Sequence, residues 1–359
     1  MQLPPPLAWL IDDAGSLAGA DQFLAALGAR LIAEGLPLAG GALTLSAPHP
    51  IIARRVWLWR ADNGVVIEAL GFASMSITVL EPVTVGRDWL SGLRPHSVRE
   101  DVAGTTPDGP VLGWALSGPL TEDQSALLGA VARFAAAPLA ILALNATLVA
   151  LLETYLGRRS AAQVLAGRLR REPGETIRAA LLYADLRGFT ELSERAAPEV
   201  VVAALGAWFD RIAGAVHAFG GEVLKFIGDG VLVIFPVGGN PPSVACDGAL
   251  SAVAAARAGM AHLDESRARQ GLPPLPFGMA LHLGDIIWGN IGTADRLDFT
   301  AIGRAVNLVS RLEGLCKPLQ HTVLISGAFA AEATNPLRPL GAHELRGIDE
   351  PCEVFTLPD

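Results

Sequence analysis

Two aspartates, each at the end of an apolar, strand-like run, are the residues of this chain that most clearly suggest chemistry. Asp185 follows the run 179–184, and Asp229 lies near the end of the segment 225–230 (KFIGDG). Gly-Asp-Gly between two apolar runs predicts a tight β-hairpin, because Gly and Asp tolerate the positive φ of such turns. If a sheet brings the two strand ends together, their carboxylates can hold two hard divalent cations, an arrangement that suits phosphoryl chemistry.

The elements that must position these aspartates alternate between strand and helix from residue 177 onward. An amphipathic helix over 198–219 turns Trp208 and Ile212 inward, and an Ala-rich helix covers 243–270. The strands are expected at 179–184, 222–224 (leading into Lys225), 231–235, 277–283 and 285–291. This order, βαββαβ, predicts a ferredoxin-like α+β sheet.

A second set of polar residues follows in the segment 296–313 (RLDFTAIGRAVNLVSRLE). Asn307 and Arg311 are four residues apart, so they share one face of the expected helix. A solvated helix face is the ordinary explanation of such a pair, just as a turn or a strand-end cap would explain either aspartate alone. Finding all of them in one domain favours a functional site.

Three segments in this order, 184–190 (ADLRGFT), 225–230 and 296–313, resemble the catalytic domain of class III nucleotidyl cyclases over about residues 177–359. The resemblance implies an adenylate cyclase that converts ATP to 3′,5′-cyclic AMP and pyrophosphate with two Mg²⁺ or Mn²⁺ ions. It assigns these ions to Asp185, Asp229 and the backbone carbonyl of Leu186.

The same resemblance assigns the substrate contacts. Lys225 and Thr300 match the purine-reading positions: a lysine donates to N1 of adenine, and a hydroxyl accepts from the 6-amino group, whereas guanine presents the opposite pattern. Asn307 would orient the ribose, and the planar fork of Arg311 would stabilise charge on the phosphates. The substrate-binding set is completed by Phe189 and Arg346.

The family builds its site between two subunits, with the metal ligands on one chain and the purine and transition-state residues on the other. This chain carries both sets, so the resemblance implies a homodimer with two equivalent sites. A guanylate cyclase and a catalytically silent nucleotide-binding or dimerisation module remain alternatives. A diguanylate cyclase is excluded at its defining hairpin, because the tip here reads Gly228-Asp229-Gly230.

Residues 1–152 predict a separate α+β module whose element order resembles a GAF-type sensor domain, which implies an unidentified small-molecule effector. The expected elements are a helix at 21–34, strands at 42–46, 51–60, 65–70, 76–80 and 110–116, and a long helix from Thr121 toward Tyr155 with a break near Pro138. Possible ligand contacts are His49 and, on the strand at 51–60, Arg54, Arg55, Trp57 and Trp59. Ordinary packing of these side chains is favoured over ligand contacts.

Residues 153–176 form the joint between the modules and resemble the transducer element that precedes many cyclase domains. Their expected helix is capped by Ser160, runs through Leu169 and is stopped by Pro173-Gly174. The arginines at 158, 159, 168, 170 and 171 make this stretch basic. A linker helix that transmits a signal between the modules is therefore expected.

Composition limits the class of protein. The 359 residues carry a net charge of −9, which argues against a nucleic-acid-binding surface, and three scattered cysteines fit a reducing compartment. No secretory signal is visible, so a cytoplasmic protein is expected. The uncharged stretch 134–152 is long enough to span a bilayer, but a buried or dimer-forming helix is favoured. Membrane association through this stretch stays an alternative.

Overall fold

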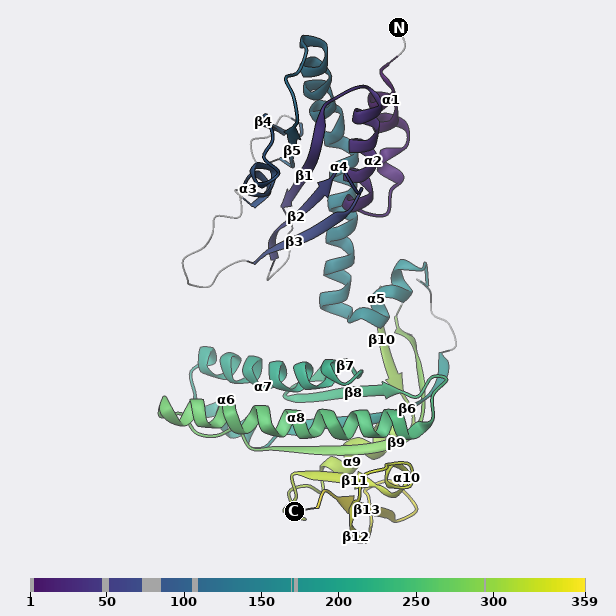
Figure 1. Cartoon of the computed structure of the whole chain (residues 1–359). Helices are drawn as coiled ribbons and strands as arrows, with labels where there is room; N and C mark the ends of the chain where they lie inside the picture. Colours follow the sequence, from purple (N-terminus) through teal and green to yellow (C-terminus); the bar gives the residue numbers. More distant parts are fainter. Residues whose placement is uncertain are drawn as a thin grey trace. The chain divides into compact units, whose positions relative to one another are not determined.

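The computed structural model describes residues 3–46, 52–72, 85–104, 109–168, 170, 174–293 and 295–358. The chain divides into two compact units, Met1–Tyr155 and Leu156–Asp359, each with its own sheet and core (Figure 1). The expected boundary near residue 152 lies close to this division.

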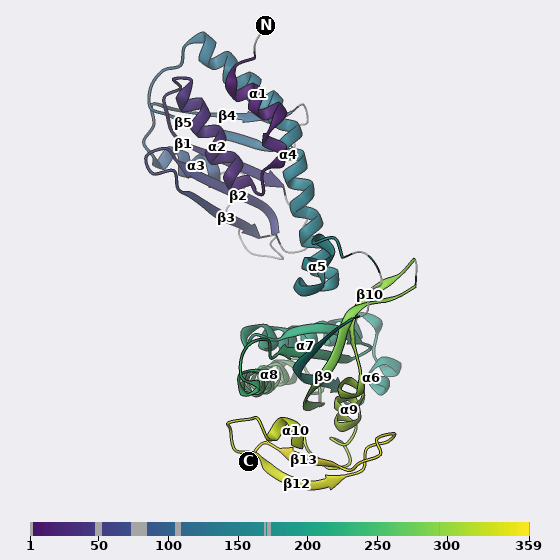
Figure 2. The same ribbon diagram turned by 90° about the vertical axis from the view of Figure 1, so that its right-hand side faces the viewer.

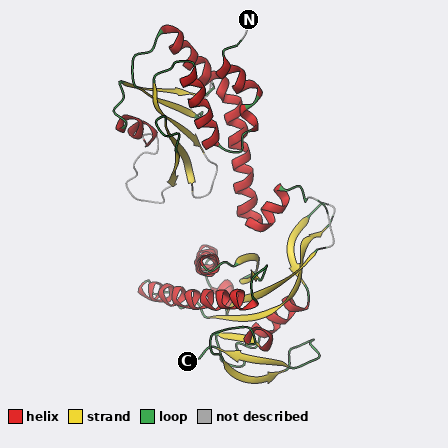
Figure 3. Ribbon diagram, turned by 45° about the vertical axis from the view of Figure 1, so that its right-hand side comes forward, coloured by secondary structure: helices red, strands yellow, loops and turns green. Residues whose placement is uncertain are grey.

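The N-terminal unit is built on a five-stranded antiparallel sheet in the order β3-β2-β1-β5-β4. One face carries α1, α2 and α4 over a core that includes Phe23, Trp57 and Trp114, and α3 covers the other face (Figure 3). The elements are α1 (Pro5–Asp12), α2 (Ala20–Ala33), β1 (Leu38–Ser46), β2 (Ile52–Arg60), β3 (Val66–Phe72), α3 (Val85–Gly92), β4 (Ser97–Val102), β5 (Val111–Leu116) and α4 (Glu122–Leu156).

The structure confirms the expected helix at 21–34, four of the expected strands and the long exit helix. It also confirms that Trp57 and Trp59 are packing residues, since both are buried in the core. His49 and the expected strand at 76–80 lie outside the described residues. Three elements were not expected, namely α1, α3 and β4, and the GAF-like identity of this unit stays a prediction.

Helix α4 begins with a reciprocal cap and continues without interruption. The Thr121 hydroxyl accepts from the amide of Gln124 at 3.2 Å, and the Gln124 side chain accepts from the amide of Thr121 at 3.0 Å. The expected break at Pro138 is wrong: the helix runs through it to Leu156. Packing of neighbouring residues, including Ala135 and Leu139, into the core holds the helix together where proline removes one hydrogen bond.

The C-terminal unit has the expected ferredoxin-like centre. Its sheet runs β12-β13-β11-β9-β6-β8-β7; the strands β9-β6-β8-β7 are antiparallel to one another, whereas β11 pairs with β9 in parallel. The elements are α5 (Arg158–Leu165), β6 (Glu175–Leu186), α6 (Phe189–Arg195), α7 (Pro198–Ala218), β7 (Glu222–Ile227), β8 (Gly230–Pro236), α8 (Pro242–Arg269), β9 (Phe277–Gly292), β10 (Leu297–Ile302), α9 (Arg304–Glu313), β11 (Val323–Ser326), α10 (Gly327–Ala330), β12 (Arg338–His343) and β13 (Cys352–Thr356).

Two cores hold this unit together, one on each face of the sheet. Helices α7 and α8 bury Trp208, Ile212 and Val253 against one face. Helix α9 buries Val309 and Leu312 against the other face. Both functional segments expected from the sequence, the β7–β8 hairpin and α9, are therefore fixed to a common sheet.

Strand β9 is one continuous strand, so the expected division into 277–283 and 285–291 is wrong. It pairs with β6 from Leu186↔Phe277 to Glu175↔Trp288 without a break. Position 284 is a glycine because α9 approaches the strand closely there: a Cβ would lie 2.8 Å from the Cβ of Ala305. Beyond the body of the sheet, β9 and β10 continue as a two-stranded arm (Figure 2).

The linker helix differs from its prediction at both ends. Helix α5 begins after Gly157, and Ser160 lies inside the helix, buried, where it caps nothing. The helix ends at Leu165, well before Pro173. Gly167, at φ 85°, donates its amide to the carbonyl of Val164 and so ends the helix with a glycine turn.

Two described helices, α4 and α7, are long and apolar enough to cross a membrane by length and composition alone. This is weak evidence, because core helices of soluble proteins pass the same test. In α7 the apolar side chains face the core of the C-terminal unit, including Trp208 and Ile212.

Candidate active site

The structure brings Asp185 and Asp229 together. Asp185 is near the end of β6, Asp229 lies in the β7–β8 turn, and β6 pairs with β8. A Cβ added to Gly230 would lie 3.1 Å from Oδ1 of Asp185. Partial burial raises the pKa of Asp185 to about 7, and the negative charge of Asp229 adds to this rise. The two carboxylates therefore form one electrostatically coupled pair.

The turn that carries Asp229 is fixed by contacts with helix α7. The indole Nε1 of Trp208, fully buried on α7, donates to the carbonyl of Asp229 at 2.9 Å. The rings of Phe209 and Phe226 pack with their centroids 4.3 Å apart and tie the hairpin to the same helix. Gly228 takes φ 63°, which agrees with the tight turn expected from Gly-Asp-Gly.

A third carboxylate, Glu313, which was not predicted from the sequence, joins this cluster. It contacts Gly278, the β9 partner of Asp185. Burial raises the pKa of Glu313, while the Arg187 guanidinium opposes that rise. The one signal in the sequence is that Glu313 ends α9, since an acid in the last turn of a helix is disfavoured by the helix dipole.

Tyr183, two residues before Asp185 on β6, was also missed. Burial raises its pKa to about 12, with the charge of Asp185 next in importance. The phenol lies beside Gly230, where no larger residue would fit. Tyr183 is partly buried and packs against the core on the α9 side of the sheet.

The aspartate pair has the donor chemistry of a hard-cation site. Among the described residues, no group of three or more His, Cys, Asp or Glu side chains forms a complete ligand set. The carboxylates of Asp185 and Asp229 offer anionic oxygens, and the neighbouring Leu186 offers a backbone carbonyl. A divalent cation would reverse the repulsion that raises the pKa of Asp185, so these residues fit Mg²⁺ or Mn²⁺.

Lys225 and Thr300 lie on neighbouring strands. Lys225, on β7, forms an ion pair with Asp298 on β10, and Thr300 lies two residues further along β10 on the same face. Asp298 was not expected as a partner. The alternation Asp298-Phe299-Thr300 could have suggested it, because the buried ring of Phe299 turns both polar neighbours to the opposite face.

The structure does not join the remaining expected residues to the aspartates within one chain. On α9 the side chains of Ala305, Val309 and Leu312 are buried, while Asn307 and Arg311 are exposed. For the part of the chain that is described, neither has a hydrogen bond or ion pair with Asp185 or Asp229. The polar face of α9 is thus open to solvent in the single chain.

The other two predicted substrate-binding residues, Phe189 and Arg346, are likewise not in described contact with the Asp185–Asp229 pair. Phe189 starts α6 and packs against the core beside the sheet. Arg346 lies exposed between β12 and β13, next to the buried Leu345. Neither has a described contact with the aspartates, so their substrate roles stay predictions.

Comparison with known proteins places this site in a family. Residues 172–347 match the model of the adenylate and guanylate cyclase catalytic domain. This part of the chain belongs to that family. The cyclase domain thus contains the aspartate pair, Lys225, Thr300 and the polar face of α9.

Relatives of the cyclase domain include adenylate cyclase 1 of Rhizobium meliloti, which is 33% identical over 181 residues, or 49% of this chain and 27% of that protein. An adenylate cyclase of Anabaena cylindrica is 31% identical over 183 residues, or 50% of this chain and 34% of that protein. The chain therefore spans about a third or less of these relatives. A solved bacterial light-regulated adenylyl cyclase aligns over 88% of this chain and 93% of its own, with a TM-score of 0.52 and 18% identity, which shows a shared fold alone.

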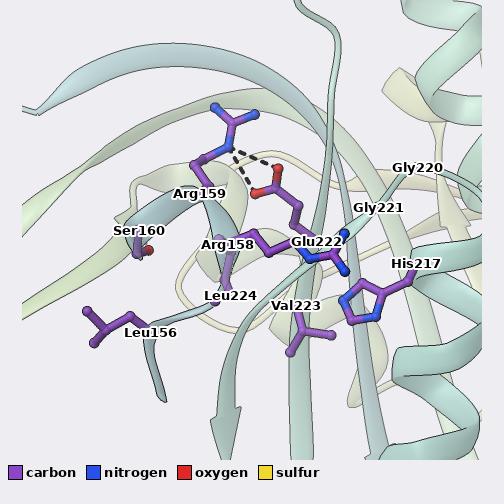
Figure 4. Close-up of a pocket in the computed structure, with 11 residues that line it drawn as sticks. Leu156, Arg158, Arg159, Ser160, His217, Gly220, Gly221, Glu222, Val223 and Leu224 are labelled. Carbon is purple, nitrogen blue, oxygen red and sulfur yellow. Dashed lines mark hydrogen bonds and ion pairs between the residues drawn. The ribbon is translucent and has the colours of Figure 1, made fainter. Parts of the chain in front are cut away.

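The linker helix α5 is anchored on the cyclase domain close to the hairpin. Nε of Arg159 donates to both carboxylate oxygens of Glu222, at 2.9 and 3.2 Å (Figure 4). The guanidinium also lies 5.6 Å from the ring centroid of Trp288. A pocket of about 280 Å³ lies beside this ion pair, with Arg158 and His217 on its wall. Since Glu222 begins β7, α5 is tied to the strand that carries Lys225.

Proposed function

We propose that this protein is an adenylate cyclase that converts ATP to 3′,5′-cyclic AMP and pyrophosphate. The observation that carries the proposal is the pairing of Asp185 with Asp229 at one end of the sheet of a cyclase catalytic domain. The curated relatives named above as adenylate cyclases support it. The reaction makes the enzyme a phosphorus–oxygen lyase.

The metal ions would be held by the carboxylates of Asp185 and Asp229 with the carbonyl of Leu186. When bound, two such ions supply a lowered pKa of the ribose 3′-OH and charge neutralisation on the triphosphate. The contribution of the protein is to hold the carboxylates in place. Trp208 does so through its hydrogen bond to the carbonyl of Asp229, and β6 does so for Asp185.

Preference for ATP follows from Lys225 and Thr300. The Lys225 ammonium donates to N1 of adenine, and the Thr300 hydroxyl accepts from the 6-amino group. The carboxylate of Asp298 forms an ion pair with the Lys225 ammonium and so holds it beside β10. Guanine presents an N1–H donor to the ammonium, and a polar pocket with unmatched groups discriminates strongly.

The exposed face of α9 supports a site shared between two copies of the chain. Asn307 and Arg311 lack a described link to the aspartates in their own chain, and a two-fold dimer would supply them to the partner's aspartates. Asn307 then orients the ribose, and Arg311 stabilises charge on the transferring phosphate. Each dimer thus has two equivalent sites.

We place regulation in the N-terminal unit and α5. A signal that moves α5 acts on Glu222 through the Arg159 ion pair, and so acts on β7 and Lys225.

The full chain incubated with ATP or GTP, each with Mg²⁺ or Mn²⁺, tests the proposal when products are separated by chromatography and identified by mass. Cyclic AMP from ATP is expected, with loss of turnover in Asp185→Asn and Asp229→Asn. Asp210→Asn, an exposed acid on α7, is the matched control and should be fully active. Cyclic GMP as the main product would make the chain a guanylate cyclase, and nucleotide binding without product would make it a silent module.

A further inference from the structure

Helix α4 carries a row of exposed apolar side chains with the spacing of a coiled coil. Its exposed large residues are Phe134, Ile141, Leu144, Leu148, Leu151 and Tyr155, with exposed fractions from 38% to 81%. The intervals from residue 141 onward are three, four, three and four, and Phe134 lies one heptad before Ile141. This is a 3.5-residue repeat, with Ala137 at the remaining position.

We propose that this row, called the α4 seam, pairs in parallel with the α4 seam of a second copy of the chain as a two-stranded coiled coil. In heptad positions, a is occupied by residues 134, 141, 148 and 155, and d by 137, 144 and 151. A 3.5-residue repeat keeps a seam in contact with another helix over several turns, whereas a helix packed on a globular core follows a period of 3.6.

The opposite side of α4 already has a partner. Leu128, Val131, Ala135, Leu139 and Leu142 are buried in the core of the N-terminal unit. The helix therefore has two apolar faces, one used within its own unit and one exposed. The exposed face needs a partner that the described part of the chain does not supply.

The exposed area suits a dimer. At roughly 180 Å² per large apolar residue, the six side chains expose on the order of 600 Å² per chain, which is at the upper end for a monomer and gives about 1,200 Å² in a symmetric pair. This reaches the lower limit of stable protein interfaces.

A second copy fits the seam better than a different protein. The flanking e and g positions carry Arg133, Pro138, Ala140, Asn145, Thr147, Leu152 and Thr154, of which only Arg133 is charged. Charged e and g residues are what normally select a foreign helix; in a parallel pair of identical helices Arg133 faces position 138, a proline, so no like charges meet. Parallel pairing also places both C-terminal ends of α4 together, which deepens the proposed homodimeric cyclase because both cyclase domains continue from that end.

A bilayer is a poorer partner for the same residues. A membrane span needs about 20 residues, and the first part of α4 is packed into the core of its own unit. From Ala143 to Leu156, at about 1.5 Å per residue, the helix covers roughly 21 Å, which is short of a hydrocarbon core of about 30 Å. Asn145 and Glu153 also lie in this part.

Cysteine cross-linking of the full chain tests the seam. Leu148→Cys places a thiol at an a position, and Ala146→Cys is the matched control, exposed two residues away on the far side of the helix. Under mild oxidation, Leu148→Cys should form a covalent dimer on non-reducing gels, while Ala146→Cys and the unaltered chain should not. Equal cross-linking at both positions, or none at residue 148, would overturn the parallel seam.

A second experiment measures the strength of the seam. Leu144→Glu with Leu148→Glu should raise the dimer dissociation constant, from sedimentation equilibrium, by at least on the order of a hundredfold, because carboxylates would be buried at the seam. Ala146→Glu should leave it unchanged. Flotation of the unaltered chain with phosphatidylcholine–phosphatidylglycerol vesicles, lost in the double variant, would overturn the proposal in favour of a membrane.

The outcomes also separate the seam from the proposed function. Cross-linking at residue 148 in a chain that makes no cyclic nucleotide would leave the seam in place and remove the cyclase. A fully active chain that does not cross-link at residue 148 would support the cyclase and overturn the α4 seam.

Discussion

Metal binding by the cyclase domain should release a proton from Asp185. Burial and the nearby charge of Asp229 raise the pKa of Asp185 to about 7, so near neutral pH a proton competes with a cation for this carboxylate. With one such proton, about a tenth of the sites are deprotonated at pH 6 and about nine tenths at pH 8. The apparent metal dissociation constant should therefore be about tenfold higher at pH 6 than at pH 8.

Binding of Mn²⁺ to the full chain without nucleotide, followed by the electron paramagnetic resonance signal of free Mn²⁺ at pH 6, 7 and 8, measures this directly. In Asp185→Asn the titrating group is gone, so binding should be weak and nearly independent of pH. The control Asp210→Asn should keep the tenfold change. Equal affinity at pH 6 and pH 8 in the unaltered chain, or an unchanged pH dependence in Asp185→Asn, would refute the assignment of the raised pKa and of the metal ligand.

Three further substitutions test other parts of the domain. Lys225→Glu with Thr300→Cys should lower the ATP-to-GTP ratio of kcat/KM by at least on the order of tenfold; an unchanged ratio would contradict the purine-reading roles. Burial lowers the pKa of His282 from 6.5 to about 4, so the native state binds fewer protons than the unfolded one. The raised pKa of Asp185 acts in the opposite direction over the same pH range, so the effect of His282 is isolated by comparison with His282→Asn. The stability of the unaltered chain in urea, relative to that variant, should fall by up to about 3 kcal/mol as the pH drops from 6.5 to 4. Trp208→Phe removes the donor to the Asp229 carbonyl and should lower the free energy of unfolding by about 1 kcal/mol. Mn²⁺ binding should become several-fold weaker; unchanged affinity would show that the Trp208 hydrogen bond does not position Asp229.

The aspartate pair was predictable because local rules agree with the fold. Apolar runs ending at Asp185 and around Gly228-Asp229-Gly230 specify a strand and a hairpin, and the βαββαβ order makes those strands neighbours. The inward face of α7 was read from its 3.6-residue period in the same way. In these cases the information lies within a few residues or in the element order.

The partners of these residues were not predictable, because they meet only in the folded chain. Asp298 reaches Lys225 across 73 positions of sequence, through the bend that brings β10 beside β7. Glu313 joins the aspartates because Gly278 leaves room for it on β9. Neither contact follows from periodicity or turn chemistry.

The predicted bounds of the linker helix were wrong for a different reason, since two local sequence signals competed at each end. Ser160 is a good capping residue, but Gly157 already begins the helix, and the turn at Gly167 ends it before the proline. The glycine at 284 suggested a strand end, but it is required by the close approach of α9, and the pairing of β9 with β6 continues through it.

The central claim, a cyclase site shared between two chains, is tested most directly by mixing two inactive variants. Asp185→Asn removes a metal ligand and Arg311→Ala removes the phosphate contact, so a mixed dimer keeps one intact site of two. Random mixing in equal amounts should restore about a quarter of the wild-type rate of cyclic AMP formation, since half of the dimers are mixed. No recovery, with mixed dimers demonstrated by mass, would contradict the shared site.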